Sequence, residues 1–178
     1  MRLSLGGILT SALLIAAPMG LAPASAEIVE TSPGLLACTT SAGQYDRIDI
    51  GRFVSGNRVT GRFRFVAGTD DRSRAPVAGY IIGFHNGEAI EVHVTADPRY
   101  PRRLDIQVGL SGTGSQTITR VSRTEPVEVT ASVVSGVLTV ASAGHSREIP
   151  IGARRVVGVD ASCQSGRFEI EFQPPVSG

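Results

Sequence analysis

Apolar and polar residues alternate with a period of two through most of this chain. In segment 58–67, valine, glycine and phenylalanine occupy one parity, and Arg58, Arg62 and Arg64 fall on the other. Segment 168–172 alternates phenylalanine and isoleucine with glutamate. Successive side chains of a β-strand point to opposite faces, so this period predicts strands with one buried face. No window keeps the spacing of an amphipathic helix over three turns. We expect an all-β chain.

Short glycine-containing turns separate these segments. Asn86-Gly87 lies between two apolar runs and is typical of a two-residue hairpin turn. Ser55-Gly56 and Ser135-Gly136 are further short reversals. We expect about eleven strands, at 45–54, 59–67, 80–85, 88–95, 104–111, 116–122, 127–134, 137–142, 146–151, 154–160 and 166–173. Many short antiparallel strands of this kind favour a β-sandwich or a barrel.

Residues 1–26 predict a secretory signal peptide. Arg2 precedes an apolar run that closes on Ala24-Ser25-Ala26, a triplet that suits a signal peptidase. We expect an irregular segment at 27–44, a sandwich domain at 45–173 and a tail at 174–178. No later apolar run is long enough to span a membrane. The protein is expected to be secreted or periplasmic, either released or retained at the envelope.

The charged residues exclude some functions. All 17 basic residues are arginine and are matched by 16 acidic ones, so bulk electrostatic binding to nucleic acid is not expected. The absence of lysine excludes Schiff-base chemistry and fits the GC-rich coding of a bacterial source. The chain has two cysteines, Cys38 and Cys163, and in an exported protein such a pair predicts a disulfide.

Three stretches resemble concanavalin A-like, laminin-G-like jelly rolls. They are GRFRFVAG followed by VAGYIIGFHNGEAIEVHV, the hairpin VTASVVSGVLTVASAG and the last strand GRFEIEF. The resemblance covers most of residues 45–173. It implies a two-sheet antiparallel sandwich and a biology related to polysaccharides. That fold supports lectins, enzymes and adhesive modules alike, so it does not by itself define the function.

Strand parity predicts a candidate binding surface. If each strand reverses on the last, the loops 68–79, 96–103, 123–126, 143–145 and 161–165 share one end of the sandwich. That end would gather Asp70, Asp71, Arg72, Arg74, Arg99, Tyr100, Arg102, Arg103, Arg123 and His145. Arginine suits carboxylate or sulfate groups, and a tyrosine can stack on a sugar ring. The ligand-binding residues predicted there are Arg72, Arg74, Arg99, Tyr100, Arg102 and Arg103, with plain solvated surface as the alternative.

No cofactor is expected. Asp70 and Asp71 could contribute to a calcium site with loop carbonyls, but two carboxylates supply too few of the oxygens that calcium needs. Their place in a turn explains them more simply, because aspartate readily hydrogen-bonds the backbone there.

A second candidate site lies on the outward face of strands 88–95 and 104–111. It offers Glu91, His93 and Asp105, which could act as acid and base in a polysaccharide hydrolase or lyase. No known catalytic signature accompanies them. We therefore expect a non-catalytic domain with a binding or structural role at the cell envelope, with an acidic polysaccharide or an envelope component as partner. A polysaccharide-acting enzyme is the alternative, and a deep groove around these three residues would favour it.

Overall fold

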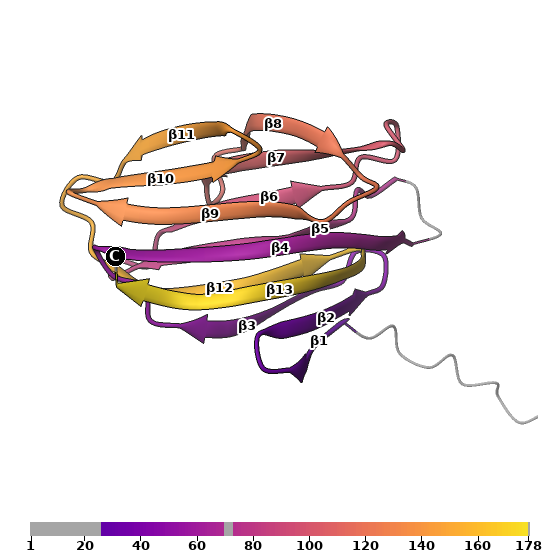
Figure 1. Cartoon of the computed structure of the whole chain (residues 1–178), viewed down its shortest axis with the longest axis horizontal. Coiled ribbons are helices and arrows are strands. Elements are labelled where there is room, and N and C mark those ends of the chain that lie inside the picture. The colour runs from indigo at the N-terminus through magenta and orange to yellow at the C-terminus, as the bar shows by residue number, and fades with distance from the viewer. Residues whose placement is uncertain (1–25, 70–72, 178) are drawn as a thin grey trace, which may run out of the picture.

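The computed structural model describes residues 26–69 and 73–177. Their thirteen strands form two antiparallel sheets that pack face to face (Figure 1). The first strands are β1 (Ala26–Ser32), β2 (Leu35–Thr40), β3 (Tyr45–Gly51), β4 (Asn57–Gly68), β5 (Val77–Phe84), β6 (Ala89–Thr95) and β7 (Arg103–Leu110). The others are β8 (Gln116–Ser122), β9 (Val127–Val134), β10 (Val137–Ser142), β11 (His145–Pro150), β12 (Val156–Gln164) and β13 (Gly166–Ser177). The predicted all-β sandwich is confirmed.

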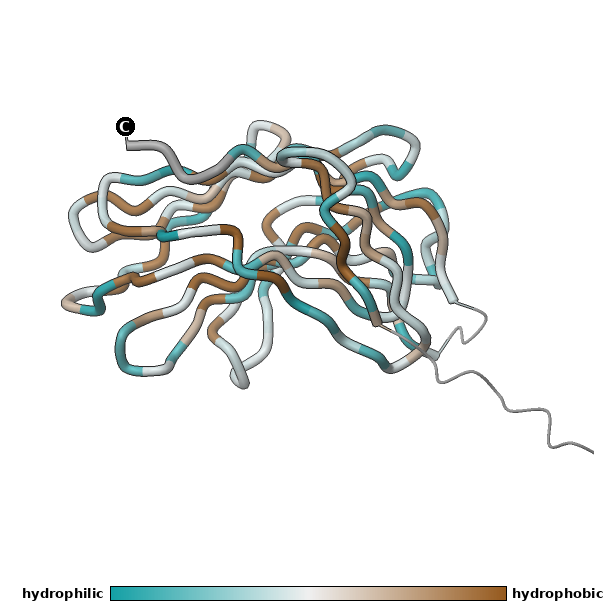
Figure 2. The backbone as a smooth tube through the Cα atoms, turned by 90° about the horizontal axis from the view of Figure 1, so that it is seen from below, coloured by the Kyte–Doolittle hydropathy of each residue, from teal (hydrophilic) through white to brown (hydrophobic). Residues whose placement is uncertain are grey.

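The seven-stranded sheet has the order β1-β2-β13-β4-β9-β10-β11, and the six-stranded sheet has the order β3-β12-β5-β6-β7-β8. The core lies between them, and apolar and polar residues alternate along the strands (Figure 2). Val59 and Phe63 of β4 and Val92 of β6 are fully buried, as the alternation predicts. Among the described residues, no helix is long and apolar enough to cross a membrane.

Both ends of the chain differ from the expectation. Residues 27–44, predicted to be irregular, form most of the hairpin β1–β2, which turns at Gly34 with a φ of 77°. The predicted tail is also wrong, because β13 continues to Ser177. Six of the seven β1 side chains are at least partly exposed, so this strand shows no amphipathic alternation. Its backbone pairing with β2 holds it, and β2 pairs with β13. The predicted signal peptide lies outside the described residues, except for Ala26.

One end of the sandwich carries the longer loops, on the right in Figure 1. We call it the long-loop end; it comprises the connections after β2, β4, β6, β8, β10 and β12. Backbone hydrogen bonds tie these loops together. Ala96 N–H donates to the Pro76 carbonyl at 2.9 Å, and Arg123 N–H donates to the Arg102 carbonyl at 3.1 Å. The loops predicted to share one end therefore do so where the structure describes them.

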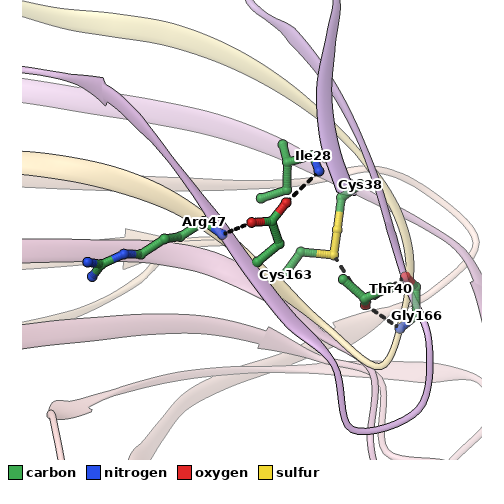
Figure 3. Close-up of a disulfide and its surroundings, with 7 residues drawn as sticks. Ile28, Cys38, Thr40, Arg47, Cys163 and Gly166 are labelled. Atoms are coloured by element: carbon green, nitrogen blue, oxygen red, sulfur yellow. Dashed lines mark hydrogen bonds between the residues drawn. A yellow bond between two sulfur atoms is a disulfide. The ribbon is translucent and has the colours of Figure 1, made fainter. Parts of the chain in front are cut away.

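The predicted disulfide between Cys38 and Cys163 is confirmed, and it links the two sheets (Figure 3). Cys38 belongs to β2 and Cys163 to β12, with Cα atoms 6.3 Å apart. The buried Thr40 lies beside it: its hydroxyl donates to the Gly166 carbonyl at 3.2 Å and accepts from Gly166 N–H at 3.0 Å. These contacts fix the backbone of the long-loop end where β2 and β13 meet.

Candidate functional site

A cavity of about 400 Å³ opens at the long-loop end. It is lined by Phe65, Gly68, Thr69, Arg74, Pro76, Ala96, Pro98, Pro101 and Arg123. The end of β4 and three separate loops contribute these residues. Three prolines restrict the backbone of the walls, because each fixes its own φ. The cavity therefore combines a stiff apolar wall with two cationic side chains.

Arg74 and Arg123 supply the positive charge of this cavity. The guanidinium carbon of Arg123 lies 4.2 Å from the centroid of the Phe65 ring, a cation–π arrangement that holds the side chain in place. The Arg74 guanidinium packs against the backbone of Gly43, where an added Cβ would lie 2.9 Å from its Nη1. Within residues 26–69 and 73–177, no carboxylate lies within ion-pair distance of either arginine. Both arginines therefore line the cavity without a counter-ion among the described side chains.

A second cavity, of about 530 Å³, meets the first along Gly68 and Thr69. Its other lining residues are Thr39, Thr40, Ser41, Ala42, Gly166 and Arg167. Arg167 is exposed, and it too has no described carboxylate partner. We refer to the two cavities together as the end groove.

The structure separates the arginines that were predicted to bind a ligand at this end. Arg103 stacks on the Tyr100 ring at 3.6 Å, and Arg99 lies 5.9 Å from it. Arg74 instead lines the first cavity, and Arg102 is an exposed loop residue whose carbonyl accepts from Arg123. Tyr100 does not line the first cavity, although Pro98 and Pro101 of the same loop do. Arg72 lies outside the described residues.

Arg99 and Arg103 already have acidic partners. Arg99 Nη2 lies 2.7 Å from Asp97, and this hydrogen bond holds the pKa of the Asp97 carboxyl below its usual value. Arg103 Nε lies 3.3 Å from Oδ1 of the buried Asp105. These two arginines are neutralised locally, so they attract an external anion less than Arg74 and Arg123 do.

The outward face of β6 and β7 brings together only part of the predicted catalytic set. His93 Nε2 lies 3.5 Å from Glu91 Oε2, and burial lowers the pKa of His93, with Glu91 acting in the opposite direction. Asp105 is opposite Thr95 in the register, and Arg103 and Arg120 cover it. None of the five principal cavities in the described part of the chain is lined by these residues. The groove that would favour an enzyme is not found there.

Asp70 and Asp71, the weak calcium candidates, lie outside the described residues. Within residues 26–69 and 73–177, no group of three histidine, cysteine, aspartate or glutamate side chains is placed to hold a metal ion. The oxygen-rich cluster that calcium needs is therefore not formed by the described side chains.

Sequence reasoning missed Phe65 and Arg167. Phe65 has core parity in its strand, and it is half-buried because its strand reaches the end of the sandwich. Arg167 has the pattern of an ordinary outward residue of a strand. Phe65 lies just before the 68–79 loop in the sequence, but nothing in the sequence places Arg167 beside that loop, because that neighbourhood depends on how β13 pairs with β4.

Comparison with known proteins identifies the fold only. No protein-family model matches the chain, and no curated protein is similar to it in sequence. A Bacillus subtilis protein of unknown function with a galectin-like fold superposes with a TM-score of 0.56 at 10% identity, covering 86% of this chain and 87% of that chain. The carbohydrate binding module CBM66 from Bacillus subtilis superposes with a TM-score of 0.51 at 5% identity, covering 85% and 90%. The chain thus has a galectin-like jelly-roll fold, which confirms the resemblance stated for the sequence.

Proposed function

We propose that this protein is a non-catalytic carbohydrate-binding domain that recognises an acidic glycan at the long-loop end. The observation that carries the proposal is the first cavity, where Arg74 and Arg123 face the same space without a described acidic partner. A carboxylate or sulfate on a sugar would supply the missing counter-charge through charge-assisted hydrogen bonds. The apolar wall of prolines suits the C–H face of a sugar ring.

Local arrangement, rather than overall charge, would produce this binding. The formal net charge of the whole chain is only +1, so the molecule as a whole attracts polyanions weakly. Tyr100 is 45% exposed on the loop that also carries Pro98 and Pro101 of the cavity, and it offers a further aromatic surface at the same end. The superposed CBM66 is a carbohydrate binding module, which makes a glycan ligand a natural first class to test.

The proposal also places the protein outside the cytoplasm, in the secreted or periplasmic compartment. Disulfides persist in such oxidising compartments and are rare in the cytosol, so the bond between Cys38 and Cys163 supports that location. An acidic polysaccharide of the envelope or its surroundings would be accessible there.

The test compares wild-type protein with Arg74→Ala and Arg123→Ala on three immobilised polysaccharides: polygalacturonate, dextran sulfate and neutral dextran. We expect wild-type protein to bind an acidic polymer, and more tightly at low salt because exposed charges are then least screened. Each substitution should weaken binding about tenfold, the loss expected for one charge-assisted contact.

Arg155→Ala is the matched control, because it removes the same charge from an exposed residue at the opposite end. It should leave binding unchanged. The proposal is wrong if wild-type protein ignores both acidic polymers at low ionic strength. It is also wrong if Arg155→Ala weakens binding as much as Arg123→Ala, since the effect would then come from net charge.

A further inference from the structure

The second cavity adds a cation to the site just proposed. Arg167 is exposed and lies near the start of β13. In the strand register it is opposite Thr39 of β2. Thr39 and Ser41, which both carry a hydroxyl group, line the same cavity. Such hydroxyl and guanidinium groups can hydrogen-bond both the hydroxyl groups and the acidic groups of a sugar.

The backbone around Arg167 is rigidly held. Gly166 exchanges two hydrogen bonds with the Thr40 hydroxyl, and Thr40 lies 3.8 Å from the disulfide sulfur of Cys163 (Figure 3). A fixed backbone lowers the entropy lost when a ligand binds. The residues that line the second cavity are therefore carried by a rigid backbone at the long-loop end.

The junction between the cavities consists of small residues. Gly68 lines both, and a Cβ added there would meet only Pro76 Cγ, at 3.5 Å. Its φ lies outside the left-handed region, so a larger side chain is compatible with the backbone. The glycine leaves a low boundary over which a ligand chain can pass from one cavity to the other.

We infer that the end groove binds a repeating acidic polysaccharide across both cavities, with anionic groups near Arg123 and Arg74 in one and near Arg167 in the other. This inference rests on the proposed function and extends it. A single acidic sugar can satisfy only one of the two positive regions. A chain with charge on successive units engages both, and its second contact is then made intramolecularly at high effective concentration.

The experiment uses oligogalacturonides from the disaccharide to the octasaccharide, with heparin-derived fragments of the same lengths as the sulfated series. Affinity for wild-type protein is measured by calorimetry. We expect affinity to rise with length and then to level off once both cavities are filled. The better-bound series identifies the anion.

Two variants test whether the second cavity produces the increase in affinity with oligosaccharide length. Arg167→Ala should weaken octasaccharide binding about tenfold and leave disaccharide binding unchanged. Gly68→Val should obstruct passage between the cavities and weaken octasaccharide binding; because Gly68 also lines the first cavity, the comparison with the disaccharide rests on Arg167→Ala alone. Arg155→Ala should alter neither, and thermal unfolding of each variant shows whether the fold is retained.

The outcomes separate this inference from the proposed function. If the disaccharide binds as tightly as the octasaccharide and depends on Arg123, the site is confined to the first cavity and the inference is wrong while the proposed function stands. Equal losses of short and long ligands in Arg167→Ala also overturn the inference. If wild-type protein binds no acidic oligosaccharide of any length, both are wrong.

Discussion

At the scale of single residues, the arginines of the long-loop end fall into two groups. Arg99 and Arg103 are paired with Asp97 and Asp105, whereas Arg74 and Arg123 face a cavity without a described acidic partner. All four have the same side chain, so their roles differ only through their neighbours. Arg103 was predicted to be a ligand-binding loop residue, but it forms an ion pair with the buried Asp105. Without Arg103, the remaining partner of Asp105 would be Arg120, at 3.7 Å.

Tyr80 provides a prediction at this scale. It is fully buried against Phe63 and Phe172, and within the described residues its hydroxyl has no hydrogen-bond partner. A buried unsatisfied hydroxyl costs about 1–3 kcal/mol. Tyr80→Phe should therefore raise the free energy of unfolding by about 1 kcal/mol, and the melting temperature by about 2–4 °C.

The same substitution should change the response to alkali. Burial raises the pKa of Tyr80 well above the usual tyrosine value of about 10. Above about pH 10 the tyrosine of the unfolded chain loses its proton while the buried Tyr80 keeps it. The free energy of unfolding therefore falls as pH rises. Tyr80→Phe should lose stability less steeply than wild-type protein in thermal melts above pH 10. Tyr100→Phe, at an exposed position, is the control for neutral pH, and a lower melting temperature for Tyr80→Phe there would contradict the prediction.

At the scale of elements, the close approach of β5 and β6 depends on a glycine. A Cβ at Gly79 would collide with the carbonyl oxygen of Val92 and lie 3.1 Å from the Cα of His93. Gly83, four residues further along β5, has no such neighbour: the nearest atoms are 4.0 Å away. Close packing against β6 thus leaves no room for a side chain at Gly79, whereas a side chain has room at Gly83.

Gly79→Ala should lower the free energy of unfolding by about 1–3 kcal/mol, because the two strands must separate to admit the methyl group. Gly83→Ala is the matched control and should change it by less than about 0.5 kcal/mol. Urea denaturation of both variants measures the difference. Equal effects would show that the pairing of β5 with β6 adapts to the added methyl group.

At the scale of the whole molecule, one covalent bond joins the two sheets. The disulfide closes a loop between residues 125 apart in sequence, from β2 of one sheet to β12 of the other. In the chain-entropy account, a loop of this length stabilises the folded state by about 4–5 kcal/mol. The bond also holds the long-loop end, where Thr40 and Gly166 line the second cavity.

The double variant Cys38→Ser, Cys163→Ser should lose several kcal/mol of stability, about 4 kcal/mol by the same account. Thermal unfolding with and without reductant provides the measurement, because reductant should destabilise wild-type protein and leave the variant unchanged. Alkylation of the native, unreduced protein should label no thiol. Two labelled thiols would refute the bond.

The sequence by itself determined the fold class and most of the strands. Alternation is a local property, and a strand with one buried face must repeat every two residues, so Val59, Phe63 and Val92 were correctly placed in the core. Export chemistry and the presence of two cysteines were sufficient to predict the disulfide. The same rule missed β1 because almost all of its side chains are at least partly exposed and its backbone pairing leaves no pattern in the sequence.

Only the tertiary structure decided the composition of the candidate site. Strand parity correctly predicted which loops share one end, but it could not predict which of their arginines form ion pairs with an aspartate. Arg103 and Asp105 are near in sequence and pair on one face of β7, while Arg123 reaches Phe65 across the gap between the two sheets. Arg167 joins them through the pairing of β13 with β2 and β4. Phe65, Arg123 and Arg167 are far apart along the chain, and which of them meet is determined by strand order and register, which local patterns do not encode.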